Sequence, residues 1–139
     1  MHQFVNEIMS TDLHTCETSA PLAEAAQMMR DCDVGAVLAM EDGSCCGILT
    51  DRDIVVRGLA TGGELEMLHV GDLCTTEVAT LGPEDSIDRA VEMVRQRGIR
   101  RIPVMDHGKP VGMVSIGDLA IDRDPGSALG QISAAPATH

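Results

Sequence analysis

The heptapeptide GILTDRD, residues Gly47–Asp53, recurs further along the chain as GMVSIGD, residues Gly112–Asp118. Both copies have a glycine, two aliphatic residues, a hydroxyl residue, two unmatched positions and an aspartate, at an offset of 65 positions. In each copy a short apolar run, typical of a strand, leads into the start of a helix. The two motifs therefore predict that the fold contains the same strand-to-helix unit twice.

The repetition extends over most of the chain, because ten positions are identical at the same offset without a gap. Examples are Val5 with Val70, Met28 with Met93 and Gly43 with Gly108. Internal repeats of this length indicate a supersecondary unit that packs against its own copy. We expect a first repeat at residues 5–60, a linker at 61–69, a second repeat at 70–122, and a tail at 123–139 that forms a short helix with a frayed end.

Each repeat predicts the element order β-α-β-β-α. Pro21 suits the first turn of a helix, Asp85 is a candidate N-cap, and Gly43 and Gly108 suit hairpin turns that need a positive φ. The elements expected in the two repeats are strands at 13–16 and 78–81, helices at 21–32 and 86–97, strands at 34–40 and 99–105, strands at 46–49 and 111–114, and helices at 53–59 and 118–121. One repeat is too small to bury its own sheet face. The prediction is an α/β fold with α+β layers, in which two copies pack face to face about a pseudo-two-fold axis.

Composition excludes several classes of function. The chain has 139 residues, is 44% apolar and 23% charged, and carries a formal net charge of −12, so we expect a globular protein. The acidic charge and a single aromatic residue, Phe4, argue against nucleic-acid binding. Without a membrane-length apolar run or a secretory leader, we expect a cytoplasmic protein and no membrane partner. Six of the ten basic residues fall within positions 89–109, which favours a local site for a small anion.

The pairs Thr50–Asp53 and Ser115–Asp118 have the spacing of a capping box, in which the hydroxyl and the carboxylate close a helix start. The same junction can also hold a ligand. Its free N–H groups favour phosphate, and a carboxylate can accept two hydrogen bonds from the 2′ and 3′ hydroxyls of a ribose. Capping and ligand binding are compatible, and the residues leave both readings open.

The paired G-h-h-[ST]-x-x-D motifs (h, hydrophobic), together with the segment RRIPV at 100–104, resemble a pair of cystathionine-β-synthase (CBS) domains. The resemblance covers residues 5 to about 122 and is nearest in type to stand-alone hypoxic-response CBS-pair proteins. It implies a tandem CBS-domain pair that senses ligands in clefts between its repeats. The implied ligands are adenosine compounds such as AMP, ADP, ATP or S-adenosylmethionine.

The resemblance also implies roles for individual residues. Asp53 and Asp118 hold ribose hydroxyls, and Thr50 and Ser115 bond the ribose or the α-phosphate. Further implied contacts are phosphate contacts by Arg100 and Arg101, and an aliphatic sandwich for adenine that includes Ile102 and Pro103. The first repeat has GAVLA at 35–39 where the second has RRIPV, although Arg52 is a partial substitute. We therefore expect one stronger site, in the second repeat.

Three other classes of site compete with this interpretation. A metal site is suggested by His14 with Cys16 and by His69 with Cys74, but the spacing of a closed zinc site is missing. A redox role for Cys45–Cys46 conflicts with the neighbouring acidic residues, which raise a thiol pKa. An enzymatic site is not indicated, because no nucleophile is paired with a base in the sequence, and His107, in a turn, is expected to be solvated rather than to act as a general base.

We expect a regulatory, non-enzymatic ligand sensor without an obligatory cofactor or metal. It is expected to form a homodimer through its exposed helices and to act on an effector protein that the sequence does not identify. The alternative is a dimeric scaffold or stress-response interaction protein whose clefts stay empty.

Overall fold

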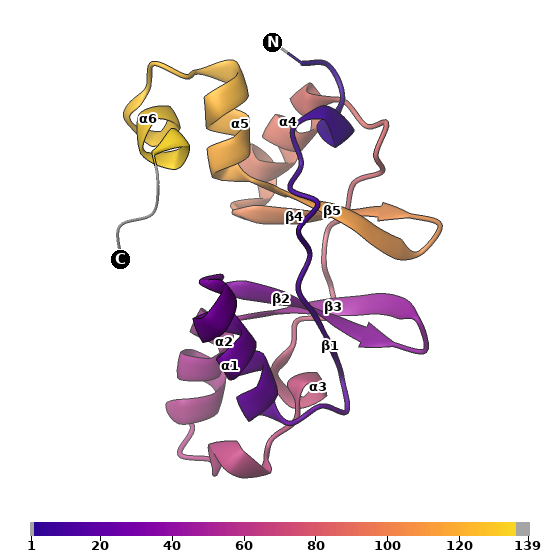
Figure 1. The fold of residues 1–139 in the computed structure, drawn as a ribbon, viewed down its shortest axis with the longest axis vertical. Helices are drawn as coiled ribbons and strands as arrows, with labels where there is room; N and C mark the ends of the chain where they lie inside the picture. Colours follow the sequence, from indigo (N-terminus) through magenta and orange to yellow (C-terminus); the bar gives the residue numbers. More distant parts are fainter. Residues whose placement is uncertain (1, 136–139) are drawn as a thin grey trace. The chain divides into compact units, whose positions relative to one another are not determined.

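The computed structural model describes residues 2–135 and separates into two compact units. The first unit is Leu13–Val78, and the second unit combines Met1–Asp12 with Ala79–His139. Over the described residues, two small sheets combine with six α-helices (Figure 1). The mixed α/β class predicted from the sequence is confirmed. No helix within residues 2–135 has the length and apolar character needed to cross a bilayer.

The compact units are offset from the sequence repeats, because each unit contains the opening segment of the other repeat. In the second unit, the Val5 N–H donates to the Asp85 carbonyl at 2.9 Å, and Ser10 forms an antiparallel bridge with Met113. In the first unit, Thr75 forms the corresponding bridge with Ile48. Each unit is therefore closed by a segment that lies far away in the sequence.

The first unit has a three-stranded sheet in the order β1-β2-β3, with β1 parallel and β3 antiparallel to β2. Its elements are β1 (Thr15–Glu17), α1 (Leu22–Cys32), β2 (Ala36–Glu41), β3 (Ser44–Thr50), α2 (Asp51–Asp53), the π-helical segment η2 (Ile54–Leu59), the 3₁₀ segment η3 (Leu65–Met67) and α3 (Val70–Leu73). One face of α1 packs on the sheet through Leu22, Ala25 and Met29. Figure 1 shows the helices of this unit on one side of its sheet.

The second unit has an antiparallel pair, β4-β5, covered by helices in the same way (Figure 1). Its elements are the 3₁₀ segment η1 (Val5–Glu7), α4 (Ile87–Arg97), β4 (Arg101–Asp106), β5 (Lys109–Ser115), α5 (Ile116–Arg123) and α6 (Ala128–Ala134). The core is formed by Val5, Leu81, Ile87, Ala90, Ile102, Val104, Val114 and Leu119. Burial of this apolar set is the main stabilising contribution to the unit.

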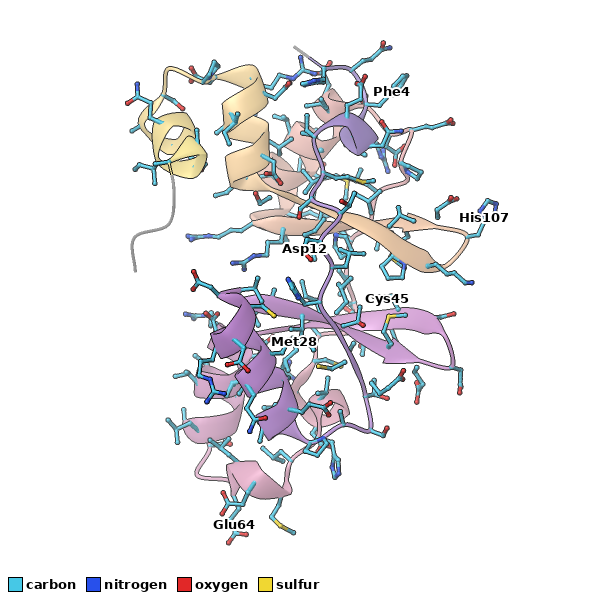
Figure 2. All side chains as sticks on the ribbon, viewed as in Figure 1. Phe4, Asp12, Met28, Cys45, Glu64 and His107 are labelled. Carbon is cyan, nitrogen blue, oxygen red and sulfur yellow. The ribbon has the colours of Figure 1, made fainter. Side chains whose placement is uncertain are left out.

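The two hairpins turn as the glycine pattern predicts. Gly43 has φ 80° and Gly108 has φ 81°, and the preceding residues Asp42 and His107 also have positive φ, at 52° and 53°. Two successive positive φ values are the signature of the two-residue turn that matches strand twist. Figure 2 shows His107 at the tip of its hairpin, where its side chain is 95% exposed. A solvated turn residue of this kind is not positioned as a catalytic base.

Three local expectations were wrong. The strand expected at 78–81 is reduced to a single parallel bridge between Leu81 and Val104. In the first unit the Leu38 N–H donates to the His14 carbonyl, but the corresponding residue of the second unit, Pro103, has no N–H, and Pro83 ends the pairing on the other side for the same reason. The N-cap of α4 is Ser86, not Asp85, which instead accepts from the Gly82 N–H at 2.7 Å. Helix α1 begins one residue after Pro21. The tail does form a helix, α6, and the frayed end expected beyond it falls largely outside the described residues.

The first glycine of each motif lies against the segment that closes its unit, but the neighbours differ. A Cβ atom on Gly47 would lie 2.5 Å from the Thr75 carbonyl oxygen, which is held by a bond from the Ile48 N–H at 3.0 Å. A Cβ atom on Gly112 would overlap the side chain of Met9. A methionine side chain can rotate away, whereas a bonded backbone carbonyl cannot move alone.

We therefore expect Gly47→Ala to lower the free energy of unfolding by about 1–3 kcal/mol, as overpacking does. The matched variant Gly112→Ala is expected to cost less than Gly47→Ala, because Met9 Sδ and Cγ can rotate away and only Met9 Cβ, at 3.1 Å, stays close to the new methyl group. Urea unfolding followed by circular dichroism measures both. Equal losses for the two variants would contradict the distinction between backbone and side-chain contact.

Candidate functional site

The two motifs form matching strand-to-helix junctions. In the second unit, the Ser115 N–H donates to Asp118 Oδ2 at 2.9 Å, and the Asp118 N–H donates to Ser115 Oγ at 3.1 Å. In the first unit, Thr50 and Asp53 form the same reciprocal pair at 2.9 and 3.1 Å. Both pairs are complete capping boxes, as the spacing predicts.

The cap leaves part of each carboxylate available. All four side chains are partly exposed, and Asp118 uses only Oδ2 in its cap. Within residues 2–135, Asp118 Oδ1 has no hydrogen-bond partner. A carboxylate with one fixed and one free oxygen can hold a hydroxyl pair without leaving the helix start.

Arg100 and Arg101 lie directly beside this junction. Arg101 is paired with Ser115 in the β4-β5 register, and the Arg100 carbonyl accepts from the Ile116 N–H at 3.0 Å. Both arginine side chains are exposed, and neither has an ion-pair partner among the described residues. Two arginines whose backbone flanks the start of α5, without ion-pair partners among the described residues, add positive charge to this part of an acidic protein, which favours a phosphate.

The first unit has the same backbone without these charges. Ala36 is paired with Thr50, and the Gly35 carbonyl accepts from the Asp51 N–H at 3.0 Å. Arg52 is exposed in the first turn of α2, one position before Asp53. The two junctions therefore share their geometry and differ in charge.

Ile102 and Pro103 are placed differently from the other predicted site residues. Ile102 is fully buried in the core of the second unit, and Pro103 is also among the fully buried side chains. Neither presents exposed side-chain surface. A contact of these two residues with adenine stays a prediction.

Asp118 also lines an open cavity of about 470 Å³ in the second unit, a feature that no sequence pattern indicated. Its lining residues are His2, Glu7, Ile8, Asp118, Ile121, Asp122 and Pro125. The lining contains three carboxylates and no arginine. The acidic cavity and the arginine pair are therefore separate features of this unit, and a phosphate is favoured at the arginines.

The carboxylate of Asp122 anchors the N-terminal segment to this cavity. Its Oδ1 accepts from the His2 backbone N–H at 3.1 Å and contacts His2 Nδ1 at 2.7 Å. Burial raises the pKa of Asp122, but the His2 hydrogen bonds and nearby Arg123 outweigh it and hold this pKa below its usual value. His2 and Asp122 are 120 positions apart, so no local pattern could reveal the contact.

The thiols and imidazoles do not form a reactive cluster. Burial raises the pKa of Cys16, Cys45, Cys46 and Cys74, so these thiols are less ionised than free cysteine. His69 contacts Asp72 at 3.6 Å rather than a cysteine. In the part of the chain that the structure describes, no three His, Cys, Asp or Glu side chains converge in a way that could hold a metal ion.

Comparison with known proteins identifies relatives of the whole repeat pair. Residues 5–59 and 70–121 match the family model described as the CBS domain. The CBS domain-containing protein YhcV of Bacillus subtilis is 36% identical over 133 residues, covering 93% of this chain and 94% of that protein. Hypoxic response protein 1 of Mycobacterium tuberculosis is 32% identical over 115 residues, covering 82% of this chain and 80% of that protein.

Solved structures agree with this assignment. The structure of Hypoxic Response Protein I, which holds two coordinated zinc ions, matches with a TM-score of 0.76 at 31% identity and covers 84% of this chain and 96% of that one. The structure of CBSX2 in complex with AMP matches with a TM-score of 0.73 at 21% identity and covers 86% of this chain and 94% of that one. At that identity, the CBSX2 match shows the fold alone.

The capping boxes give a direct test of the junction. Ser115→Ala removes the acceptor of the Asp118 N–H, so we expect a loss of about 0.5–2 kcal/mol in the free energy of unfolding. Ser115→Thr keeps the hydroxyl and reproduces the residue found at position 50, so its cost is expected to be below about 0.5 kcal/mol. Denaturant unfolding compares the two. A threonine variant as unstable as the alanine variant would show that the hydroxyl bond does not stabilise the junction.

Proposed function

This chain belongs to the CBS-domain family, whose paired domains are regulatory, and from that premise we propose that it is a sensor of adenine nucleotides rather than an enzyme. The ligand binds at the β5–α5 junction of the second unit. The observation that carries the proposal is the placement of Arg100 and Arg101 beside the Ser115–Asp118 cap. AMP in the CBSX2 structure indicates that the fold accommodates such a ligand.

In this proposal, different residues of the junction contact the ribose and the phosphate. Asp118 accepts hydrogen bonds from the ribose hydroxyls through its free oxygen, and Ser115 bonds the ribose or the α-phosphate. Arg100 and Arg101 neutralise the phosphate with charge-assisted hydrogen bonds, which are about twice as strong as neutral ones. A nucleotide therefore binds more tightly than the matching nucleoside.

The first unit provides a weaker site of the same design. Thr50 and Asp53 can hold a ribose, but Gly35 and Ala36 supply no charge opposite them. Arg52 provides one cation, from the helix side only. We infer that the second-unit site is filled first.

Ligand binding regulates by shifting a conformational equilibrium. A ligand that contacts one conformation better than another shifts the population by its differential affinity. The effector is a protein that recognises the favoured conformation. AMP, ADP, ATP and S-adenosylmethionine share the adenosine moiety, and the phosphate contacts distinguish the first three from the last.

We expect AMP to raise the melting temperature of the wild type by several degrees, because a ligand at one hundred times its Kd adds about 2.7 kcal/mol to stability. The ligand-induced shift is expected to vanish in Asp118→Ala and to persist in the matched variant Asp53→Ala. A thermal-shift panel with AMP, ADP, ATP, S-adenosylmethionine and adenosine measures this. Each variant is compared with its own ligand-free state, so the loss of the cap does not enter the difference.

The double variant Arg100→Ala/Arg101→Ala separates phosphate from ribose recognition. It should lose most of the AMP shift and keep any adenosine shift. No shift with any compound in folded wild-type protein would overturn the sensor proposal. The alternative, a dimeric scaffold with empty sites, would then be the better account.

We also propose that the chain forms a homodimer through the helical face of the first unit. Val55, Val56 and Leu59 are 55%, 46% and 59% exposed on η2. Three large apolar side chains exposed on one short segment favour coverage by another protein surface. A second copy of the chain is the simplest partner, because a two-fold dimer buries the same patch on both subunits.

We expect Val56→Glu to convert a dimer into a monomer in size-exclusion chromatography with light scattering, because the charge would be buried in the interface. Ile132→Glu, which changes another exposed apolar residue (72% exposed) on α6, is the matched control and should stay dimeric. A wild-type monomer at all concentrations would contradict the dimer.

A further inference from the structure

Helix α6 packs directly on the first turns of α5, beside the proposed nucleotide site (Figure 1). The contact is close at two glycines. A Cβ atom on Gly130 would lie 2.6 Å from the Asp124 carbonyl oxygen, and one on Gly117 would lie 2.6 Å from Ser133 Oγ. Gly117 is one of the two unmatched positions inside the Ser115–Asp118 motif. Helix α6 therefore meets the motif itself.

Hydrogen bonds in the connection between α5 and α6 fix the position of α6 against α5. Ser127 is the N-cap of α6 and accepts from the Gly130 N–H at 3.0 Å. Its own hydroxyl donates to the Asp124 carbonyl at 2.8 Å, and the Asp124 N–H bonds the Ala120 carbonyl at 2.8 Å. These bonds fix the turn between the helices and so set where the last turn of α6 lies.

Ser133 is the residue that this arrangement brings to the site. The Cβ position of Gly117 lies 2.6 Å from Ser133 Oγ and 3.5 Å from Ser115 Oγ, so the two hydroxyls flank the same face of Gly117. Ser133 is partly buried, and within residues 2–135 its hydroxyl has no hydrogen-bond partner. A partly buried hydroxyl without a partner, next to the cap serine, is available to a ligand.

We propose that α6 completes the second-unit site, with the Ser133 hydroxyl donating a hydrogen bond to the nucleotide phosphate. The proposal rests on the proposed function and adds to it the element that favours phosphorylated over unphosphorylated adenosine compounds. Gly117 also contributes its backbone N–H, at the second position of α5, where no intrahelical partner exists. Ser133, Gly117 and the arginine pair surround one phosphate.

The first repeat has neither a glycine at the position of Gly117 nor a helix packed as α6 is. Position 52, which corresponds to Gly117, is an arginine, and the segment that follows the first repeat is the 61–69 linker rather than a packed helix of the α6 kind. An arginine at this position leaves no room for a helix at the distance seen for α6. The phosphate preference is therefore specific to the second-unit site.

Calorimetric titration with AMP and with adenosine tests the proposal on the full chain. Ser133→Ala removes the hydroxyl and should weaken AMP binding about tenfold, the usual effect of one hydrogen bond to a charged group, while adenosine binding stays unchanged. Gly117→Ala keeps Ser133 but pushes α6 away, so it should weaken AMP binding at least as much. Ser44→Ala, in the hairpin of the first unit, is the matched serine control and should bind both compounds as the wild type does.

The outcomes separate the two proposals. Because the Ser133 hydroxyl bonds no described residue, Ser133→Ala should keep the melting temperature of the ligand-free wild type, which shows that the helix is intact. Wild-type AMP affinity in both Ser133→Ala and Gly117→Ala would overturn the role of α6 and leave the sensor proposal standing. Equal losses of AMP and adenosine binding would overturn the phosphate contact. Absence of AMP binding in the wild type would overturn both proposals.

Discussion

Each strand-to-helix junction of this structure depends on two reciprocal hydrogen bonds between residues three positions apart. The Ser115–Asp118 pair turns an extended strand into a helix without leaving the first helical N–H groups unsatisfied. The same bonds fix the carboxylate of Asp118 at the surface of the junction. The Asp118 side chain loses its rotamer freedom when the protein folds. A ligand that bonds Asp118 would therefore cause little further loss of side-chain entropy.

Because both repeats have this cap, any functional difference between the two junctions must come from the residues around the cap. The backbone pairing beside the cap is the same in the two units, Ala36 with Thr50 and Arg101 with Ser115. Two side-chain differences, Gly35 against Arg100 and Ala36 against Arg101, therefore add two positive charges to the second junction without a change of fold. In a chain of net charge −12, such a site is electrostatically distinct from most of the surface. A local potential of this kind favours small anions over polyanions, which would also meet the surrounding acidic residues.

The sequence predicts those parts of the fold that depend on neighbouring residues. The hairpin glycines and the capping boxes were foreseen because φ preference and hydrogen bonds three positions apart are local properties. The exchange of opening segments was not foreseen, because nothing in residues 5–12 indicates that they pair with Met113 rather than within their own repeat. In the sequence Gly117 is an unmatched motif position, because its close approach to Ser133 depends on how α6 packs. Similarly, the burial of Ile102 in the core of the second unit depends on how helices pack over β4, which the segment RRIPV alone does not indicate.

On the proposed function, the fixed geometry of the cap limits how a nucleotide can shift the conformation of the protein. In that proposal, the cap already fixes the Asp118 carboxylate before a nucleotide binds, so this contact contributes little differential affinity, and only differential affinity shifts a population. The groups that do change are those without partners before binding: the two exposed arginines and, on our proposal, the Ser133 hydroxyl of α6. Ordering the arginines costs side-chain entropy, which the charge-assisted bonds to phosphate must exceed. On the proposed function, a ribose without a phosphate therefore binds at the cap without shifting the equilibrium, and the phosphate contacts produce the shift.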